Sequence, residues 1–88
     1  MNDTSGLRSG WLVIVNPNAG HGKGVKDWKI ISDLLIHYDL EFDSQFTLAR
    51  RHAILLTQEA IRSGYRKFIV VGGDGTMNEV VNGIFTQD

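Results

Sequence analysis

The sequence has 88 residues, a formal net charge of −1 and no cysteine. A chain of this length forms at most one small domain, its charge gives no basis for a nucleic-acid partner, and the lack of cysteine excludes disulfides and thiolate metal sites. The longest apolar runs, residues 11–15 and 68–71, are far shorter than the roughly 20 residues of a membrane-spanning helix, so we expect a cytoplasmic protein with no transmembrane segment.

The first predicted element is a strand over residues 11–15, which are apolar on both faces as in the centre of a parallel sheet. Residues 1–10 before it are polar and lack periodicity, and we interpret them as a loose leader. Pro17 ends the strand, because proline has no N–H to donate to a ladder. The glycines of residues 20–24 then predict a flexible loop at the carboxyl end of this strand.

Two helices and an edge strand are predicted in the middle of the chain. Residues 25–38 show helical spacing of apolar side chains. The apolar face of this helix would consist of Val25, Trp28, Ile31, Leu35 and Tyr38. Residues 42–46 alternate in polarity, which predicts a strand near a sheet edge. The second helix is predicted over residues 49–63, with Gly64 as its terminator.

Residues 68–71 predict a third, buried strand, and a third helix follows it. The apolar face of this helix would consist of Met77, Val80, Val81, Ile84 and Phe85. Between the two elements lies Gly72-Gly73-Asp74-Gly75-Thr76. Glycine lets a ligand approach the backbone, and a helix start offers unpaired N–H groups and about half a positive charge. This stretch therefore predicts an anion site, most often one for phosphate.

Two common phosphate motifs do not fit the sequence. The dinucleotide motif G-x-G-x-x-G would need glycine where Asn78 stands, and the P-loop motif would need glycine where Pro17 stands. A tight turn without a ligand is the alternative, and Thr76 with Glu79 matches a capping box that would support it. We favour a ligand, because three glycines around an aspartate exceed what a turn needs.

The alternation of strands and helices predicts a three-layer α/β fold, in which helices cover both faces of a parallel sheet. Both glycine loops follow the carboxyl end of a strand, where open α/β sheets bind ligands. One ligand can contact both loops only if the first and third strands are neighbours, so we predict the strand order 2-1-3. The third helix should pack Val80, Val81 and Ile84 onto the sheet. Because three strands leave apolar surface uncovered, residues 11–88 are interpreted as part of a larger domain.

Two segments resemble the diacylglycerol kinase catalytic domain, a family that includes bacterial lipid kinases and sphingosine and ceramide kinases. They are residues 15–20, Val-Asn-Pro-Asn-Ala-Gly, and residues 72–83, Gly-Gly-Asp-Gly-Thr-Met-Asn-Glu-Val-Val-Asn-Gly. The resemblance implies the amino-terminal part of a two-domain lipid kinase whose second domain is missing here. ATP, with Mg²⁺, would donate its γ-phosphoryl group to a lipid hydroxyl at a membrane surface, which implies peripheral attachment to the membrane. The resemblance leaves open whether the protein forms a homo-oligomer.

The resemblance also assigns roles to individual residues. Those that would contact the nucleotide are Asn16, Pro17, Asn18, Ala19, Gly20, Thr47, Gly72, Gly73, Asp74, Gly75, Thr76, Met77 and Asn78. Asp74 would have a catalytic role, in which its carboxylate helps to organise Mg²⁺ or the phosphoryl acceptor; a turn aspartate bonded to its own backbone is the alternative. The family's general base and further magnesium-binding residues lie in its carboxyl-terminal half, so the chain alone should be inactive. Arg50 and Arg51 are interpreted as a solvated helix start, and contact with a phosphate or a lipid headgroup is the alternative.

Two other functions stay open at this point. The Gly-Gly-Asp-Gly core also occurs in NAD kinases, which would phosphorylate a nucleotide instead of a lipid. Here Asn78 and Glu79 follow the core at once, as in the lipid kinases. The second alternative is a regulatory module that keeps the nucleotide-binding loops without catalysing a reaction.

Overall fold

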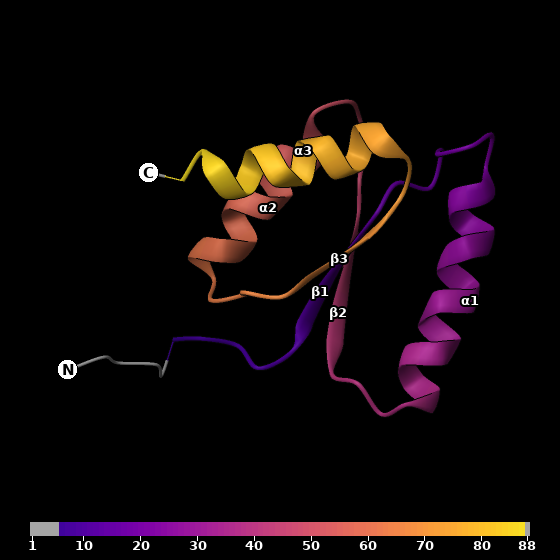
Figure 1. The fold of residues 1–88 in the computed structure, drawn as a ribbon, viewed down its shortest axis with the longest axis horizontal. Coiled ribbons are helices and arrows are strands. Elements are labelled where there is room, and N and C mark those ends of the chain that lie inside the picture. The colour runs from indigo at the N-terminus through magenta and orange to yellow at the C-terminus, as the bar shows by residue number, and fades with distance from the viewer. Residues whose placement is uncertain (1–5, 88) are drawn as a thin grey trace.

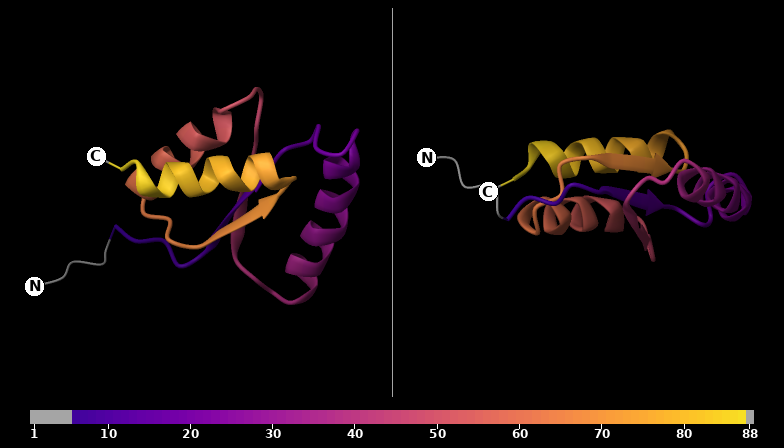
Figure 2. Two further views of the ribbon diagram at one scale, coloured as in Figure 1. Left: turned by 45° about the horizontal axis from the view of Figure 1, so that its top comes forward. Right: turned by 90° about the horizontal axis from the view of Figure 1, so that it is seen from below.

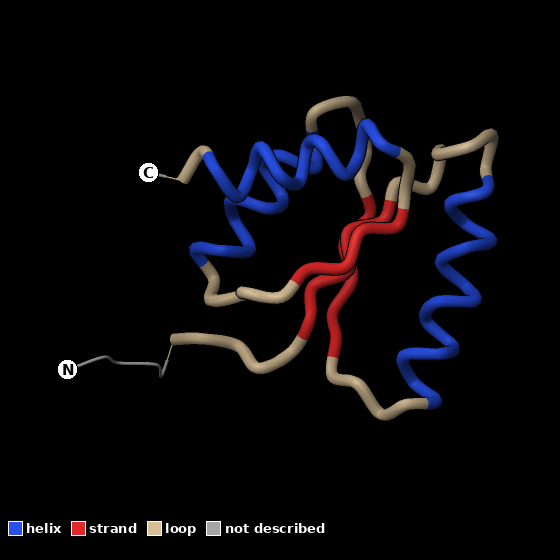
Figure 3. Tube along the Cα trace, viewed as in Figure 1, coloured by secondary structure: helices blue, strands red, loops and turns tan. Residues whose placement is uncertain are grey.

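The computed structural model describes residues 6–87, in which three strands alternate with three helices. The elements are β1 (Trp11–Val15), α1 (Lys23–His37), β2 (Phe42–Phe46), α2 (His52–Arg62), β3 (Phe68–Val71) and α3 (Asp74–Phe85). The strands form one parallel sheet in the order β2-β1-β3, which confirms the predicted order (Figures 1 and 3). Val15 pairs with Phe46 on one side and with Val71 on the other, so the three strands end level with one another.

The sheet lies between α1 on one face and the pair α2 and α3 on the other (Figure 2). Successive side chains of a strand point to opposite faces, and β1 supplies both cores. Leu12 and Ile14 pack in the core that includes residues of α2 and α3, whereas Val13 and Val15 pack with Leu35 of α1. This explains why the first strand has no polar position, and it confirms the predicted three layers.

The apolar face of α3 is turned differently from the prediction. Val80 is buried, with 2% of its surface exposed, but Val81 and Ile84 are 40% and 41% exposed, so their predicted packing onto the sheet is wrong. The reason is that α3 packs closely on α2 through Gly83, where a Cβ would lie 2.6 Å from the Cβ of Thr57. The inner face of α3 therefore consists of Thr76, Val80 and Gly83, at positions i, i+4 and i+7.

The face of α1 is also narrower than predicted. Leu35 is buried and Trp28 packs edge-on against Phe42 and Phe46 of β2, with ring centroids 6.0 and 6.2 Å away. Val25 and Tyr38, which were expected on this face, are 55% and 69% exposed. A helix of 15 residues is about 22 Å long, whereas a five-residue strand spans about 17 Å. The ends of α1 therefore extend past the sheet.

The amino-terminal segment is held at the opposite edge of the molecule from the glycine loops. Residues 1–5 of the predicted leader lie outside the described part, but Arg8 donates its backbone N–H to the carbonyl of Gly64, 2.9 Å away, and its guanidinium lies 4.9 Å from the ring centre of Tyr65. Gly64 follows the C-cap of α2 and terminates this helix as predicted, and its φ of 105° favours glycine. The Tyr65 hydroxyl donates to the carboxylate of Asp43, which raises the pKa of Tyr65 above its ordinary value, and burial raises it further.

Within residues 6–87, none of the helices combines the length and the apolar character that crossing a bilayer requires.

Candidate functional site

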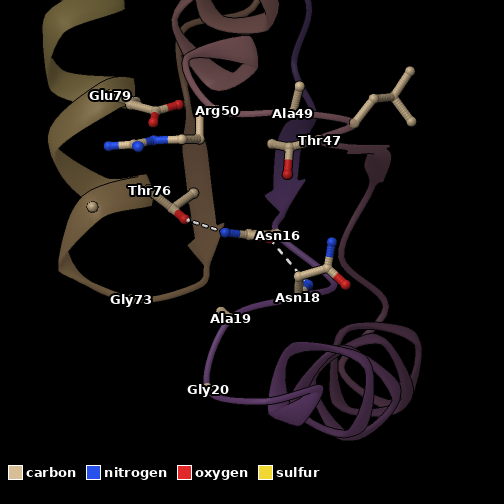
Figure 4. Close-up of a pocket in the computed structure, with 12 residues that line it drawn as sticks. Asn16, Asn18, Ala19, Gly20, Thr47, Ala49, Arg50, Gly73, Thr76 and Glu79 are labelled. Atoms are coloured by element: carbon tan, nitrogen blue, oxygen red, sulfur yellow. Dashed lines mark hydrogen bonds between the residues drawn. The ribbon is translucent and has the colours of Figure 1, made fainter.

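A cavity of about 330 Å³ opens at the edge where the three strands end. Its walls come from the loop after β1, the turn after β2 and the first turn of α3 (Figure 4). The lining residues are Asn16, Asn18, Ala19, Gly20, Thr47, Leu48, Ala49, Arg50, Gly73, Gly75, Thr76 and Glu79. The structure thus brings both predicted glycine loops to one cavity, as the strand order requires.

Asn16 connects the two glycine loops. Its Oδ1 accepts the N–H of Asn18 at 3.0 Å, and its Nδ2 donates to Oγ1 of Thr76 at 3.1 Å (Figure 4). Its backbone N–H donates to the carbonyl of Val71, 2.8 Å away. Because all of these atoms are engaged within the protein, the side chain of Asn16 is suited to positioning the loops.

The loop after β1 bends back so that α1 begins directly beneath it. Gly20, His21 and Gly22 have φ values of 58°, 57° and 91°, a conformation that glycine adopts cheaply. The carbonyls of Ala19, Gly20 and Gly22 accept the first N–H groups of α1, at distances of 3.1 to 3.3 Å. The amino end of α1 therefore has its donors occupied, and this loop lines the cavity with residues 18–20.

The amino end of α3 has free donors. The helix begins at Asp74, and its first backbone hydrogen bond runs from the N–H of Met77 to the carbonyl of Gly73, at 3.1 Å. The N–H groups of Asp74, Gly75 and Thr76 have no acceptor among residues 6–87. A Cβ added at Gly73 or Gly75 would meet no atom within 4 Å. Free N–H groups beside open space, at a positive helix end, fit an anionic group such as phosphate.

Thr76 has a different role from the predicted one. It is the third residue of α3, 7% exposed, and its hydroxyl accepts from Asn16; among the described residues no side chain caps this helix. The capping-box interpretation of Thr76 and Glu79 is therefore wrong, because the N-cap residue is Gly73 and the helix starts three residues earlier than a cap at Thr76 requires. Glu79 lines the cavity instead. The alternative of a tight turn without a ligand therefore loses the capping box that supported it.

Asp74, Met77 and Asn78 do not line this cavity. Together with Gly75 and Val81 they line a separate, open depression next to the first turn of α3. Asp74 is therefore near the free N–H groups but faces a different hollow. Two further predicted residues, Pro17 and Gly72, line neither hollow. Gly72 has a packing role, because a Cβ there would lie 2.7 Å from Oγ1 of Thr76.

The structure adds four lining residues that the sequence analysis did not assign to the nucleotide site: Leu48, Ala49, Arg50 and Glu79. Three of them belong to the turn after β2, next to Thr47, whose N–H donates to the carbonyl of Val15 at 2.8 Å. Arg50 was interpreted as a solvated helix start, with a phosphate or headgroup contact as the alternative, and the structure places it in the lining of this cavity. The signal was present, because the carboxyl ends of parallel neighbours meet at one sheet edge. Arg50 brings a positive charge to the lining of the cavity.

A comparison with known protein families decides where the chain belongs. The sequence model of the diacylglycerol kinase catalytic domain matches residues 10–88. The chain belongs to the diacylglycerol kinase catalytic domain family. Family membership confirms the resemblance that the two glycine-rich segments indicated.

Individual proteins with lipid-kinase names are also similar to this chain in sequence. The chain is 44% identical over 83 residues to a Bacillus subtilis protein named "Putative lipid kinase YtlR". This match covers 91% of this chain and 27% of that protein. It is 34% identical to human sphingosine kinase 1, covering 86% of this chain and 20% of the kinase. It is 32% identical to a diacylglycerol kinase of Staphylococcus carnosus, and the match covers 89% of this chain and 26% of that kinase. The chain thus spans about a quarter of the length of the two bacterial lipid kinases.

Proposed function

We propose that this chain is the ATP-binding part of a lipid kinase, which transfers the γ-phosphoryl group of ATP to the hydroxyl of a diacylglycerol-like lipid. The observation that carries the proposal is the group of free N–H donors at the start of α3, beside the cavity that both glycine loops line. Phosphoryl transfer depends mainly on positioning and charge neutralisation. Backbone donors at a helix start supply part of both.

The cavity offers a distinct surface to each part of a nucleotide. The N–H groups of Gly75 and Thr76 would bind phosphate oxygens, and the guanidinium of Arg50, another lining residue, would neutralise part of their charge. Asn18, Ala19 and Gly20 form the opposite wall, in a cavity large enough for part of a nucleotide. Glu79, a carboxylate in the same cavity, would repel phosphate and is better suited to accept hydrogen bonds from the ribose or from bound water.

The described residues fit Mg²⁺ only in part. Within residues 6–87 no three His, Asp or Glu side chains gather as a metal site. Mg²⁺ commonly takes one or two carboxylates and completes its shell with water and phosphate oxygens, and Asp74 is the carboxylate nearest to the free N–H groups in sequence. When bound, the ion would neutralise charge on the phosphates.

The position of Asp74 favours the acceptor over the nucleotide as its partner. Its depression is separate from the cavity and includes the half-exposed side chains of Met77 and Val81. A lipid acceptor needs an apolar surface beside the reactive hydroxyl, and Asp74 would hold that hydroxyl by accepting its hydrogen bond. An acceptor of this kind sits in a membrane, so we place the protein at the cytoplasmic membrane surface as a peripheral protein.

The proposal is tested by completing the chain. Residues 1–88 are joined to the part of the Bacillus subtilis relative that follows its matched region, and transfer of radiolabelled phosphate to diacylglycerol in vesicles is measured with ATP and Mg²⁺. We expect activity in the chimera and none in the 88-residue chain alone. A folded chimera that binds ATP but phosphorylates no lipid would contradict the proposal.

The same chimera tests Asp74. Asp74→Asn keeps the size of the side chain but removes its charge, and we expect kcat to fall about a hundredfold, which is about 2.7 kcal/mol of barrier. Asp39→Asn is the matched control, because Asp39 lies after α1 with a φ of 59° that asparagine also tolerates. Near-normal turnover in a folded Asp74→Asn chimera would reject the catalytic role of this carboxylate.

A further inference from the structure

The turn between β2 and α2 forms one wall of the cavity, with Thr47, Leu48, Ala49 and Arg50. Its first residue is well anchored, since Thr47 is buried and its N–H donates to the carbonyl of Val15. Beyond Thr47 the chain leaves the sheet, and the side chain of Leu48 is 84% exposed. Apolar burial therefore does not hold the rest of the turn in place.

The end of the turn is conformationally unfavourable. Arg51 has a φ of 69°, in the left-handed region that is unfavourable for a residue with a Cβ. Arg51 is also the N-cap residue of α2, and its side chain makes no capping hydrogen bond. A turn with a strained residue and no cap needs another contact to stay in one conformation.

That contact comes from His52, the first residue of α2. Its Nδ1 accepts the N–H of Leu48 at 2.9 Å, and its own N–H donates to the carbonyl of Ala49 at 3.2 Å. In the described part of the chain, the bond to Nδ1 is the one hydrogen bond that any side chain makes to residues 47–51. Because Nδ1 accepts, the ring proton must be on Nε2.

We propose that His52 is a positioning residue of the nucleotide site: its Nδ1 closes the turn over residues 48–52 and so places Ala49 and Arg50 against the cavity. This inference rests on the proposed function, because it assigns the cavity to a nucleotide. His52 itself does not line the cavity, so it acts on the ligand only through the turn. The role requires an acceptor at the position of Nδ1 and does not require an imidazole.

The test compares two substitutions that differ in this acceptor. His52→Ala removes it, whereas His52→Asn restores it, since Oδ1 of asparagine is bonded to Cγ as Nδ1 is in histidine. His37→Ala is the control, because His37 is in the last turn of α1 and lines no part of the cavity. Two quantities are measured on the 88-residue chain: hydrogen exchange of the Leu48 amide, and the dissociation constant of ATP with Mg²⁺.

We expect His52→Ala to exchange the Leu48 amide about tenfold faster and to bind ATP about five- to tenfold more weakly, with the upper figure corresponding to about 1.4 kcal/mol. His52→Asn should return both values to within about twofold of wild type, and His37→Ala should leave them unchanged. A purely structural role would change stability in both His52 variants without this recovery. Equal ATP affinity in wild type and folded His52→Ala would overturn the proposal.

Two further results keep the test decisive. If His52→Ala does not fold, the wild-type ring is examined by nitrogen NMR: a proton on Nε2 supports the proposal, and a proton on Nδ1 overturns it. If the wild-type chain binds no ATP, the proposed function fails and the nucleotide part of this inference fails with it. The Leu48 exchange rates then still decide whether His52 holds the turn.

Discussion

The hydrogen bond between Asn16 and Thr76 joins two loops that are 60 residues apart in the sequence, at a part-buried position. Thr76→Val keeps the shape of the side chain next to Gly72 but removes the acceptor of Asn16 Nδ2. Leaving a part-buried donor without a partner costs about 1–3 kcal/mol at most, and we expect a loss of free energy of unfolding toward the lower end of this range. The loops should also separate, which would weaken ATP binding.

A double-mutant cycle isolates this contact from the other bonds that Asn16 makes. Thr76→Val, Asn16→Ala and the double variant are unfolded in urea, and we expect a coupling free energy of about 1 kcal/mol. The control cycle pairs Asn16→Ala with Thr86→Val, which is ten residues farther along at the C-cap of α3, about 15 Å at 1.5 Å per residue of helix. Additive effects within about 0.3 kcal/mol in the Asn16–Thr76 cycle would refute the reasoning.

Three further predictions follow from the same geometry. Gly75→Leu should change the stability in urea by less than about 0.5 kcal/mol, because a Cβ at Gly75 meets no atom within 4 Å, but it should weaken ATP binding at least about a hundredfold. Gly6→Leu is the control, because a Cβ at Gly6 also meets no atom within 4 Å. Equal ATP affinity in wild type and Gly75→Leu would speak against phosphate binding at this turn. Gly24→Ala should cost about 1–3 kcal/mol of stability, because its Cβ would overlap the carbonyl oxygen of Asn16; a loss under about 0.5 kcal/mol in urea would be inconsistent with that packing. The raised pKa of Tyr65 means that the folded state favours the neutral phenol. The neutral phenol therefore stabilises the fold below about pH 10, the pKa of tyrosine in the unfolded chain, and this stabilisation is lost as the pH rises through the pKa of Tyr65 in the folded state. Urea unfolding from pH 8 to 11 should therefore show a decline that Tyr65→Phe lacks, and identical profiles would contradict this.

The strand order could be predicted because its cause is local and visible in the sequence. β1 has no polar side chain, so both of its faces had to be buried, and both glycine loops follow a strand end. The long motif from Gly72 to Gly83 indicated the family for the same reason, because a contiguous segment carries it.

The errors have a different cause, since they depend on neighbours distant in sequence. Helical spacing indicated that Val80, Val81 and Ile84 share one side of α3, but it could not show that close packing of Gly83 on α2 would bury Val80 alone. The capping-box pattern at Thr76 was likewise local, whereas its actual partner is Asn16. Arg50 was assigned first to a solvated helix start because nothing next to it in the sequence indicates a cavity, whereas the pairing of β2 with β1 brings its turn to the same sheet edge as the glycine loops.

The central claim is that the turn at the start of α3 binds the phosphates of ATP. The most direct measurement is a titration of the ¹⁵N-labelled 88-residue chain with ATP and Mg²⁺, in which backbone amide resonances are followed by NMR. We predict the largest shifts at Asp74, Gly75 and Thr76, smaller shifts at residues 18–20, and none at Tyr65 on the opposite edge of the molecule. Unchanged amide resonances at Gly75 and Thr76 at saturating ATP would contradict the account.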